Sequence, residues 1–181
     1  EGRVLVSGMN SSSIPVADRS RYIAYLPMRG TILRGSIMDN LTGFNPQLRA
    51  NARAVAEQLG VEEAVALLPA GYDTPLDGHM TDVISPGLKQ RISVARALLH
   101  KPRLILFDNA DHGMDHESYV GIFEIMARLK GKATVVMVSE DRNIISLANR
   151  AFDISHGQIS EYPITAPRVL AGLTHVTERT A

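Results

Sequence analysis

Polar side chains stand where two predicted strands end and where one predicted helix begins, and these positions are the best placed for chemistry. Asp108 directly follows Leu104 to Phe107, a short apolar run typical of a strand buried on both faces. Ser85 is a good N-cap, and Pro86 after it suits the first turn of a helix. Because ligands meet open α/β sheets at the carboxyl ends of strands, Asp108 is placed like the acid of a metal or phosphate site.

A second candidate group follows Asp108 and consists of Asp111, His112, Asp115 and His116. Imidazole and carboxylate groups bind metals, so one interpretation of this group is a metal site. The group lies on a loop that enters a helix, however, and the pattern favours Asp115 as the N-cap of that helix, with Ser118 three residues on.

The elements that must position these residues follow from the spacing of apolar side chains. The second half of the chain predicts a helix over 86–100, a strand over 104–107, a helix over 117–129, and a buried strand over 133–138 that ends at Ser139-Glu140-Asp141. The first half predicts strands over 3–6 and 22–26, an irregular loop over 28–35, and helices over 45–60 and 62–68. Alternating helices and strands imply parallel strands with right-handed crossovers, so we expect an α/β fold.

Composition narrows the class of protein. The 181 residues carry 19 Lys plus Arg and 19 Asp plus Glu, a balance that does not favour nucleic acid as a partner. No Cys is present, which excludes disulfides and thiolate metal sites. No apolar run approaches the roughly 18–20 residues that a membrane-spanning helix needs. The chain starts without Met and enters a predicted strand almost at once, which suggests a piece of a longer chain.

In this order, the residues resemble the motifs of the nucleotide-binding domain of ATP-binding cassette (ABC) transporters of the exporter type. The signature motif LSGGQ is similar to Ile84-Ser85-Pro86-Gly87-Leu88, the Walker B strand to Leu104 to Asp108, and the D-loop to His112-Gly113-Met114-Asp115. The segment that ends in the Q-loop glutamine is similar to Tyr25-Leu26-Pro27-Met28, and the H-loop is similar to Val138-Ser139-Glu140-Asp141. The match spans about 2–162 in one register.

The resemblance implies a P-loop NTPase-like parallel sheet core with a helical subdomain, the fold of ABC-type ATPases. We expect a partial nucleotide-binding domain over 1–162, with the helical subdomain at about 42–100 and a tail over 163–181. The phosphate loop G-x-x-x-x-G-K-[ST] does not occur in these 181 residues. In the family that loop precedes the strand that begins near Arg3, so the N-terminal portion of the domain is expected to be missing.

Three positions depart from the family's hydrolytic site. Asp108 is the family's Mg²⁺-site acid and is kept, but Asn109 stands where the family has the Glu that polarises the attacking water. An amide cannot accept a proton, so help from a general base is lost. Met28 replaces the Q-loop Gln, and its thioether is a poor Mg²⁺ ligand. Glu140 replaces the switch His, so repulsion of the γ-phosphate replaces attraction.

The signature motif keeps Ser85 and Gly87 but has Pro86 in place of a glycine and Leu88 in place of the glutamine. The resemblance implies that Ser85 and Gly87 face a nucleotide held by a partner domain, with Asp115 of the D-loop nearby. Pro86 removes one backbone N–H from a helix start that the family presents to phosphate. Ser85 can also be explained as a helix cap alone.

The expected function is that of an ATP-binding domain of an ABC exporter whose own hydrolytic site is degenerate. The resemblance implies ATP and Mg²⁺ as cofactors, with a transmembrane domain and a second nucleotide-binding domain as partners. The location would be the cytoplasmic face of a cell membrane, such as the bacterial inner membrane, with 28–36 as the transmembrane contact. Two alternatives stay open: a scaffold or regulatory domain that keeps the fold without binding ATP, and a soluble ABC ATPase of the repair or translation kind.

Overall fold

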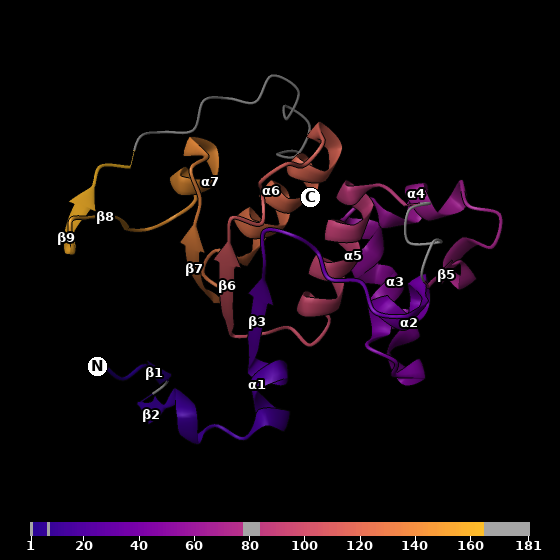
Figure 1. Ribbon diagram of the computed structural model, residues 1–181, viewed down its shortest axis with the longest axis horizontal. Helices are drawn as coiled ribbons and strands as arrows, with labels where there is room; N and C mark the ends of the chain where they lie inside the picture. Colours follow the sequence, from indigo (N-terminus) through magenta and orange to yellow (C-terminus); the bar gives the residue numbers. More distant parts are fainter. Residues whose placement is uncertain (1, 7, 78–83, 165–181) are drawn as a thin grey trace, which may run out of the picture. The chain divides into compact units, whose positions relative to one another are not determined.

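The structure is a computed structural model that describes residues 2–6, 8–77 and 84–164 (Figure 1). These residues fall into two compact units, of which the first ends at Val138 and the second begins at Ser139. Each unit is described separately below.

A three-stranded parallel sheet lies at the centre of the first unit. Its strands are β3 (Ile23–Leu26), β6 (Leu104–Asp108) and β7 (Thr134–Val138), in the spatial order β3-β6-β7. Leu106 lies opposite both Tyr25 and Val136 in the register. The prediction that 104–107 and 133–138 run parallel in one sheet is therefore confirmed, and so is the α/β class.

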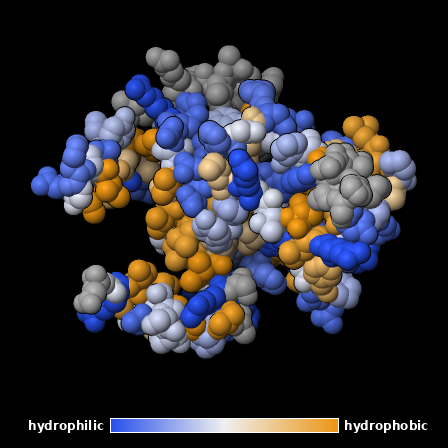
Figure 2. Space-filling view, viewed as in Figure 1, coloured by the Kyte–Doolittle hydropathy of each residue, from blue (hydrophilic) through white to orange (hydrophobic). Residues whose placement is uncertain are grey.

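The two faces of this sheet differ in burial. One face carries Ala24, Leu26, Ile105 and Phe107, all of them buried. The other face carries Tyr25, Asp108, Val136 and Val138, of which Val136 is 54% and Val138 57% exposed. Figure 2 shows apolar side chains lying open over the region of β6 and β7. The prediction that 133–138 is buried on both faces is wrong, because Val136 and Val138 are exposed, and on the same face of β6 the residues are only half-buried.

Helices gather beside β3 (Figure 1). Four of them pack on one another, with α5 contacting α2, α3 and α4 as well as β3: α2 (Ile37–Thr42), α3 (Arg49–Gln58), α4 (Val61–Ala66) and α5 (Pro86–Leu98). Helix α6 (His116–Leu129) also contacts α5 and connects β6 to β7. Their apolar stripes form the core, which includes Ile92 of α5 and Ile122 of α6, both completely buried.

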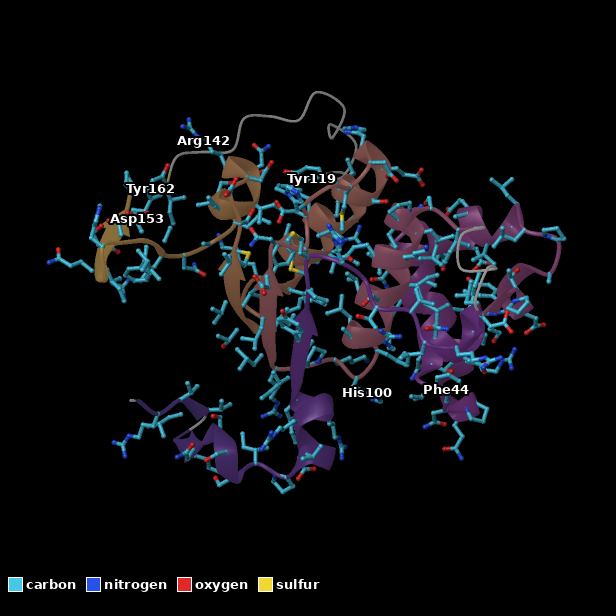
Figure 3. The ribbon with its side chains drawn as sticks, in the orientation of Figure 1. Phe44, His100, Tyr119, Arg142, Asp153 and Tyr162 are labelled. Carbon is cyan, nitrogen blue, oxygen red and sulfur yellow. The ribbon has the colours of Figure 1, made fainter. Side chains whose placement is uncertain are left out.

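The remaining elements of the first unit are short. They are β1 (Leu5–Val6), β2 (Met9–Asn10), α1 (Val16–Tyr22), β4 (Gly35–Ser36), β5 (Pro75–Leu76), and the 3-10 turns η1 (Ser11–Ser13), η2 (Pro46–Leu48) and η3 (Gly71–Asp73). Phe44, labelled in Figure 3, follows α2, and its ring lies where a side chain on Gly35 would start, with Cε1 2.9 Å from that position. Glycine suits this position because its φ of 151° is one that side chains rarely adopt, and the Phe44 ring would also have to move to admit a Cβ atom.

The second unit holds α7 (Arg142–Ser146) and a hairpin of β8 (Ala151–Ser155) and β9 (Gln158–Tyr162). Asp141 caps α7, since its side chain accepts from the N–H groups of Asn143 and Ile144.

The predicted domain over 1–162, its helical subdomain over 42–100 and the tail over 163–181 stay predictions, and 165–181 lies outside the described residues. Within the described ranges, no helix combines the length and the apolar character needed to cross a bilayer.

Candidate functional site

The carboxyl ends of β3 and β6 bring Tyr25 and Asp108 together. Both side chains stand on the open face of the sheet, and the Tyr25 hydroxyl donates a 2.8 Å hydrogen bond to Oδ2 of Asp108. This bond, with the desolvation and the negative charge that accompany it, raises the pKa of Tyr25 above its usual value. Tyr25 therefore stays protonated and holds one oxygen of the Asp108 carboxylate.

Asn109 occupies a backbone conformation that few side chains tolerate. It follows β6 with a φ of 48°, in the left-handed region where Asn is enriched among non-glycine residues. Its N–H donates to the carbonyl of Val138 at 2.8 Å, and its carbonyl accepts from the N–H of His112 at 3.0 Å. Main-chain bonds thus fix Asn109 beside the end of β7.

Ser85 begins α5 as its N-cap. Its hydroxyl oxygen accepts a 3.1 Å hydrogen bond from the N–H of Leu88, and its side chain is exposed. Pro86 occupies the first helical position, where a missing N–H costs nothing to the helix. The expected helix over 86–100 and its cap are both confirmed. An exposed hydroxyl at a helix start is a suitable place for an anion.

Gly87 packs directly against the start of α6. A Cβ atom on Gly87 would lie 2.3 Å from Oδ2 of Asp115 and 2.7 Å from Oγ of Ser118. Asp115 caps α6 by accepting a 2.8 Å hydrogen bond from the N–H of Ser118, as the spacing predicts. The structure therefore brings Ser85, Gly87 and Asp115 to one place, where the amino ends of α5 and α6 meet.

The cap on α6 gives a testable dependence on pH. The N–H of Ser118 holds the pKa of the Asp115 carboxyl below its usual value. A lowered folded-state pKa means that the carboxylate stabilises the fold above the unfolded pKa of about 3.9, and that this stability is lost as pH falls through the folded pKa. Asp115→Asn keeps a capping oxygen without the charge, so we expect it to cost at most about 1 kcal/mol at pH 7.

That difference should begin to shrink as pH falls below the unfolded pKa of about 3.9, and it should approach zero only below the lowered folded-state pKa, where the wild-type carboxyl is protonated in both states. Denaturant unfolding of both proteins across this range measures the difference in the free energy of unfolding. A difference that stays constant down to pH 3 would show that the Asp115 charge does not support the cap.

Two further residues join these parts, and the family resemblance gave neither of them a role. Tyr25 is one, and the signal for it is the register of a parallel sheet, which puts it on the face of Asp108. Gln90 of α5 is the other: its Nε2 donates to the carbonyls of Pro27, at 2.8 Å, and Ala110, at 3.2 Å. Met28, next to Pro27, is exposed.

Glu140 lies two residues past the end of β7 and belongs to the second unit. Its neighbours form a local turn, in which the N–H of Asp141 donates to Oγ of Ser139 at 3.0 Å. The structure therefore places Glu140 within that unit alone and does not test its predicted role.

At the end of β6, the Asp108 carboxylate supplies a hard oxygen ligand for a divalent cation. No cluster of three or more His, Asp or Glu side chains suited to a metal occurs in the described ranges, and that includes the loop with His112 and His116. Mg²⁺ is commonly held by one or two carboxylates while phosphates and waters complete the octahedron. A carboxylate with one oxygen held by Tyr25 fits that mode of binding, and it does not fit a cage built from protein alone.

Comparisons with known proteins agree with this arrangement. A family model described as ABC transporter matches residues 1–112. The chain is 30% identical over 161 residues to the cyclolysin secretion/processing ATP-binding protein of Bordetella pertussis, covering 88% of this chain and 22% of that protein. It is 31% identical over 161 residues to the alpha-hemolysin translocation ATP-binding protein of Escherichia coli O157:H7, covering 88% and 23%. It is 30% identical over 163 residues to an ABC multidrug transporter of Trichophyton tonsurans, covering 87% and 12%.

Among solved structures, the fold is similar to that of a bacterial Atm1-family ABC exporter with ATP bound. The TM-score is 0.78 at 24% identity, with 89% of this chain and 28% of that chain covered, and this likeness concerns the fold. The chain spans less than a quarter of the length of each of the three curated relatives.

Proposed function

Because the chain belongs to the ABC transporter family, as an exporter-type nucleotide-binding domain, we propose that it helps to clamp ATP between two such domains while its own site does not hydrolyse it. The observation that carries this proposal is the pair at the end of β6. Asp108 keeps its carboxylate, and Asn109 beside it has an amide where the family has a carboxylate. Such a site retains a group that binds Mg²⁺ and lacks the group that would activate water.

On the domain's own side, Asp108 would hold Mg²⁺ through water. The ion, when bound with ATP, supplies positive charge that offsets the charge of the phosphates. Tyr25 keeps the Asp108 carboxylate oriented by donating to one of its oxygens. Asn109 is neutral at any pH of interest, so no proton can be taken from water there. Met28 and Glu140, in place of the family's Gln and His, would each weaken contact with the ion or the γ-phosphate.

On the other side, the domain would offer the start of α5 to a nucleotide held by a partner domain. This helix has 13 residues, an exposed Ser85 hydroxyl and the N–H of Gly87 at its amino end. The dipole of the helix favours the negative charge of a phosphate there. Asp115 would hold the glycine backbone in place through the contact between α5 and α6.

The partners follow from the family. We propose a second nucleotide-binding domain across the ATP, and a transmembrane domain that contacts residues 28–36 at the cytoplasmic face of a membrane. Exposed Met28 and Leu33 support a contact along this segment. A scaffold or regulatory domain that keeps the fold without ATP is the second candidate, because Met28, Asn109 and Glu140 have all lost the family's chemistry.

The test measures ATP binding and hydrolysis by the full-length protein. We expect saturable Mg²⁺-dependent binding, about tenfold weaker in Asp108→Ala, and hydrolysis no faster than in Asn109→Ala. Ser85→Ala should reduce ATP-dependent association of the domains, while the matched control Ser160→Ala on β9 should not. Absence of saturable binding in the wild type supports the scaffold function instead. Hydrolysis that Asn109→Ala abolishes would contradict an inactive site.

A further inference from the structure

One buried amide on α5 joins the two loops that flank the nucleotide site. Gln90 is 4% exposed, and its Nε2 donates to the carbonyl of Pro27, at 2.8 Å, and to the carbonyl of Ala110, at 3.2 Å. Its Oε1 is buried without a hydrogen-bond partner among the described residues. A buried amide oxygen without a hydrogen bond carries a desolvation cost. Packing alone therefore does not explain a glutamine at this position.

The two acceptors sit beside residues of the candidate site. Pro27 follows β3 and precedes Met28, and Ala110 follows Asn109 at the end of β6. These carbonyls belong to segments more than 80 residues apart in the chain, as the positions 27 and 110 show. One side chain therefore fixes the main chain on both sides of the site at once.

The helix that carries Gln90 also carries Ser85. The two positions are five residues apart, so about 7.5 Å of helix separates them along its axis. The turns between them are held by regular hydrogen bonds, beginning with that from the N–H of Lys89 to the carbonyl of Ser85 at 3.0 Å. The amino end of α5 and Gln90 therefore belong to one continuous stretch of hydrogen-bonded helix.

A second set of contacts presses the loop after β3 onto the same helix. A Cβ atom on Gly30 would lie 2.6 Å from the carbonyl oxygen of Lys89 and 2.7 Å from Cα of Gln90, so the two backbones touch. Further along, Nη2 of Arg96 donates to the carbonyl of Thr31 at 2.6 Å. The segment 27–31 thus lies on α5 at three successive points, and Gln90 makes the first of them.

We propose that Gln90 is a positioning residue that couples the amino end of α5 to the loops after β3 and β6. Through it, engagement of Ser85 with a phosphate changes the placement of Met28 and Asn109 in the same domain. The two faces of the domain, one offered to a partner's nucleotide and one bordering its own, are linked by this side chain. The part of the proposal that involves ATP rests on the proposed function, whereas the link between the loops does not.

The test is amide hydrogen exchange on the full-length protein without nucleotide. In Gln90→Met, which keeps the volume and removes the donor, exchange should quicken about tenfold at both 28–30 and 109–111. Gln90→Glu keeps the shape but faces both carbonyls with acceptors, so its effect should be at least as large. Gln58→Met on the exposed face of α3 controls for the substitution, and Thr42→Val, which removes a buried bond within α2, controls for general loss of stability.

Quickened exchange at only one of the two segments, or equal changes in Thr42→Val, would overturn the link. Gly30→Ala keeps Gln90 and should quicken exchange at 28–30 alone, which preserves a test if the Gln90 variants fold poorly. ATP should slow amide exchange at 109–111 in the wild type. This effect of ATP should be absent in Gln90→Met. A wild type that shows no effect of ATP would overturn the proposed function, while the nucleotide-free pattern still decides the link.

Discussion

Replacing Arg91 with methionine is expected to lower the free energy of unfolding by about 2–4 kcal/mol, among the largest effects of any single change in this chain. Arg91 lies in the middle of α5 with a side chain only 5% exposed. Its Nη1 donates to the carbonyl of Gly60 at 2.8 Å and lies 3.4 Å from that of Leu59, both just past the end of α3. Without Arg91, carbonyls at this helix end lose a buried charged donor.

The ion pair of Arg91 with Glu117 of α6 contributes little to this effect. Nη1 lies 3.2 Å from Oε1 of Glu117, but the Glu117 side chain is 71% exposed. Ion pairs of exposed side chains contribute only about 0–1 kcal/mol to the free energy of unfolding. Glu117→Gln should therefore cost far less than Arg91→Met. Arg128→Met, which breaks an exposed pair with Glu124 on α6, is the matched control, at no more than about 0.5 kcal/mol. Chemical denaturation compares them, and equal losses in both Arg variants would contradict this account.

Gly87→Ala is expected to cost about 1–3 kcal/mol, because the new methyl group has no room. Its carbon would lie 2.3 Å from Oδ2 of Asp115 and 2.7 Å from Oγ of Ser118. Either α5 moves away from α6, which is overpacking at about 1–3 kcal/mol, or Asp115 gives up its cap at about 1 kcal/mol. Thermal or denaturant unfolding measures the loss.

A double-mutant cycle isolates the contact. Asp115→Gly removes the obstructing carboxylate, and glycine is a tolerated N-cap, so this change alone should cost only a few tenths of a kcal/mol. In that background Gly87→Ala should cost less than half of what it costs in the wild type. Additive losses would show that the glycine is needed for a reason other than the Asp115 carboxylate. The cycle also separates folding from any contact of Gly87 with a nucleotide.

Local sequence patterns were enough to predict the elements that form the centre of the fold. The apolar run 104–107, the β-branched run 133–138 and the helix that Ser85 caps have strong local signals, and all three are confirmed. The short helices α1 and α2 were not expected. For α2 the signal is the capping box. The Ser36 side chain accepts from the N–H of Asp39, and the Asp39 side chain accepts from the N–H of Ser36. For α1 no side-chain cap marks the start.

The site was predictable in part. Motif order pointed to Ser85, Gly87, Asp108 and Asp115, and the structure places each of them at or next to the end of a helix or strand, while their roles at the site stay predictions. Tyr25 and Gln90 act through partners 83 and 63 residues away in the chain, so only the register and the packing reveal them. The burial of the sheet was misjudged for a related reason: an apolar run shows that both faces can be covered, and it does not show what covers them.

The left-handed backbone at Asn109 also bears on how this position can change over evolutionary time. Whatever chemistry the residue serves, its main chain is tied to Val138 and His112 at a φ of 48°. Glycine, aspartate and asparagine enter that conformation at little cost, whereas valine and isoleucine are nearly barred from it. Substitutions at this position should therefore be limited by the backbone conformation as well as by catalysis, and β-branched residues should be rare there.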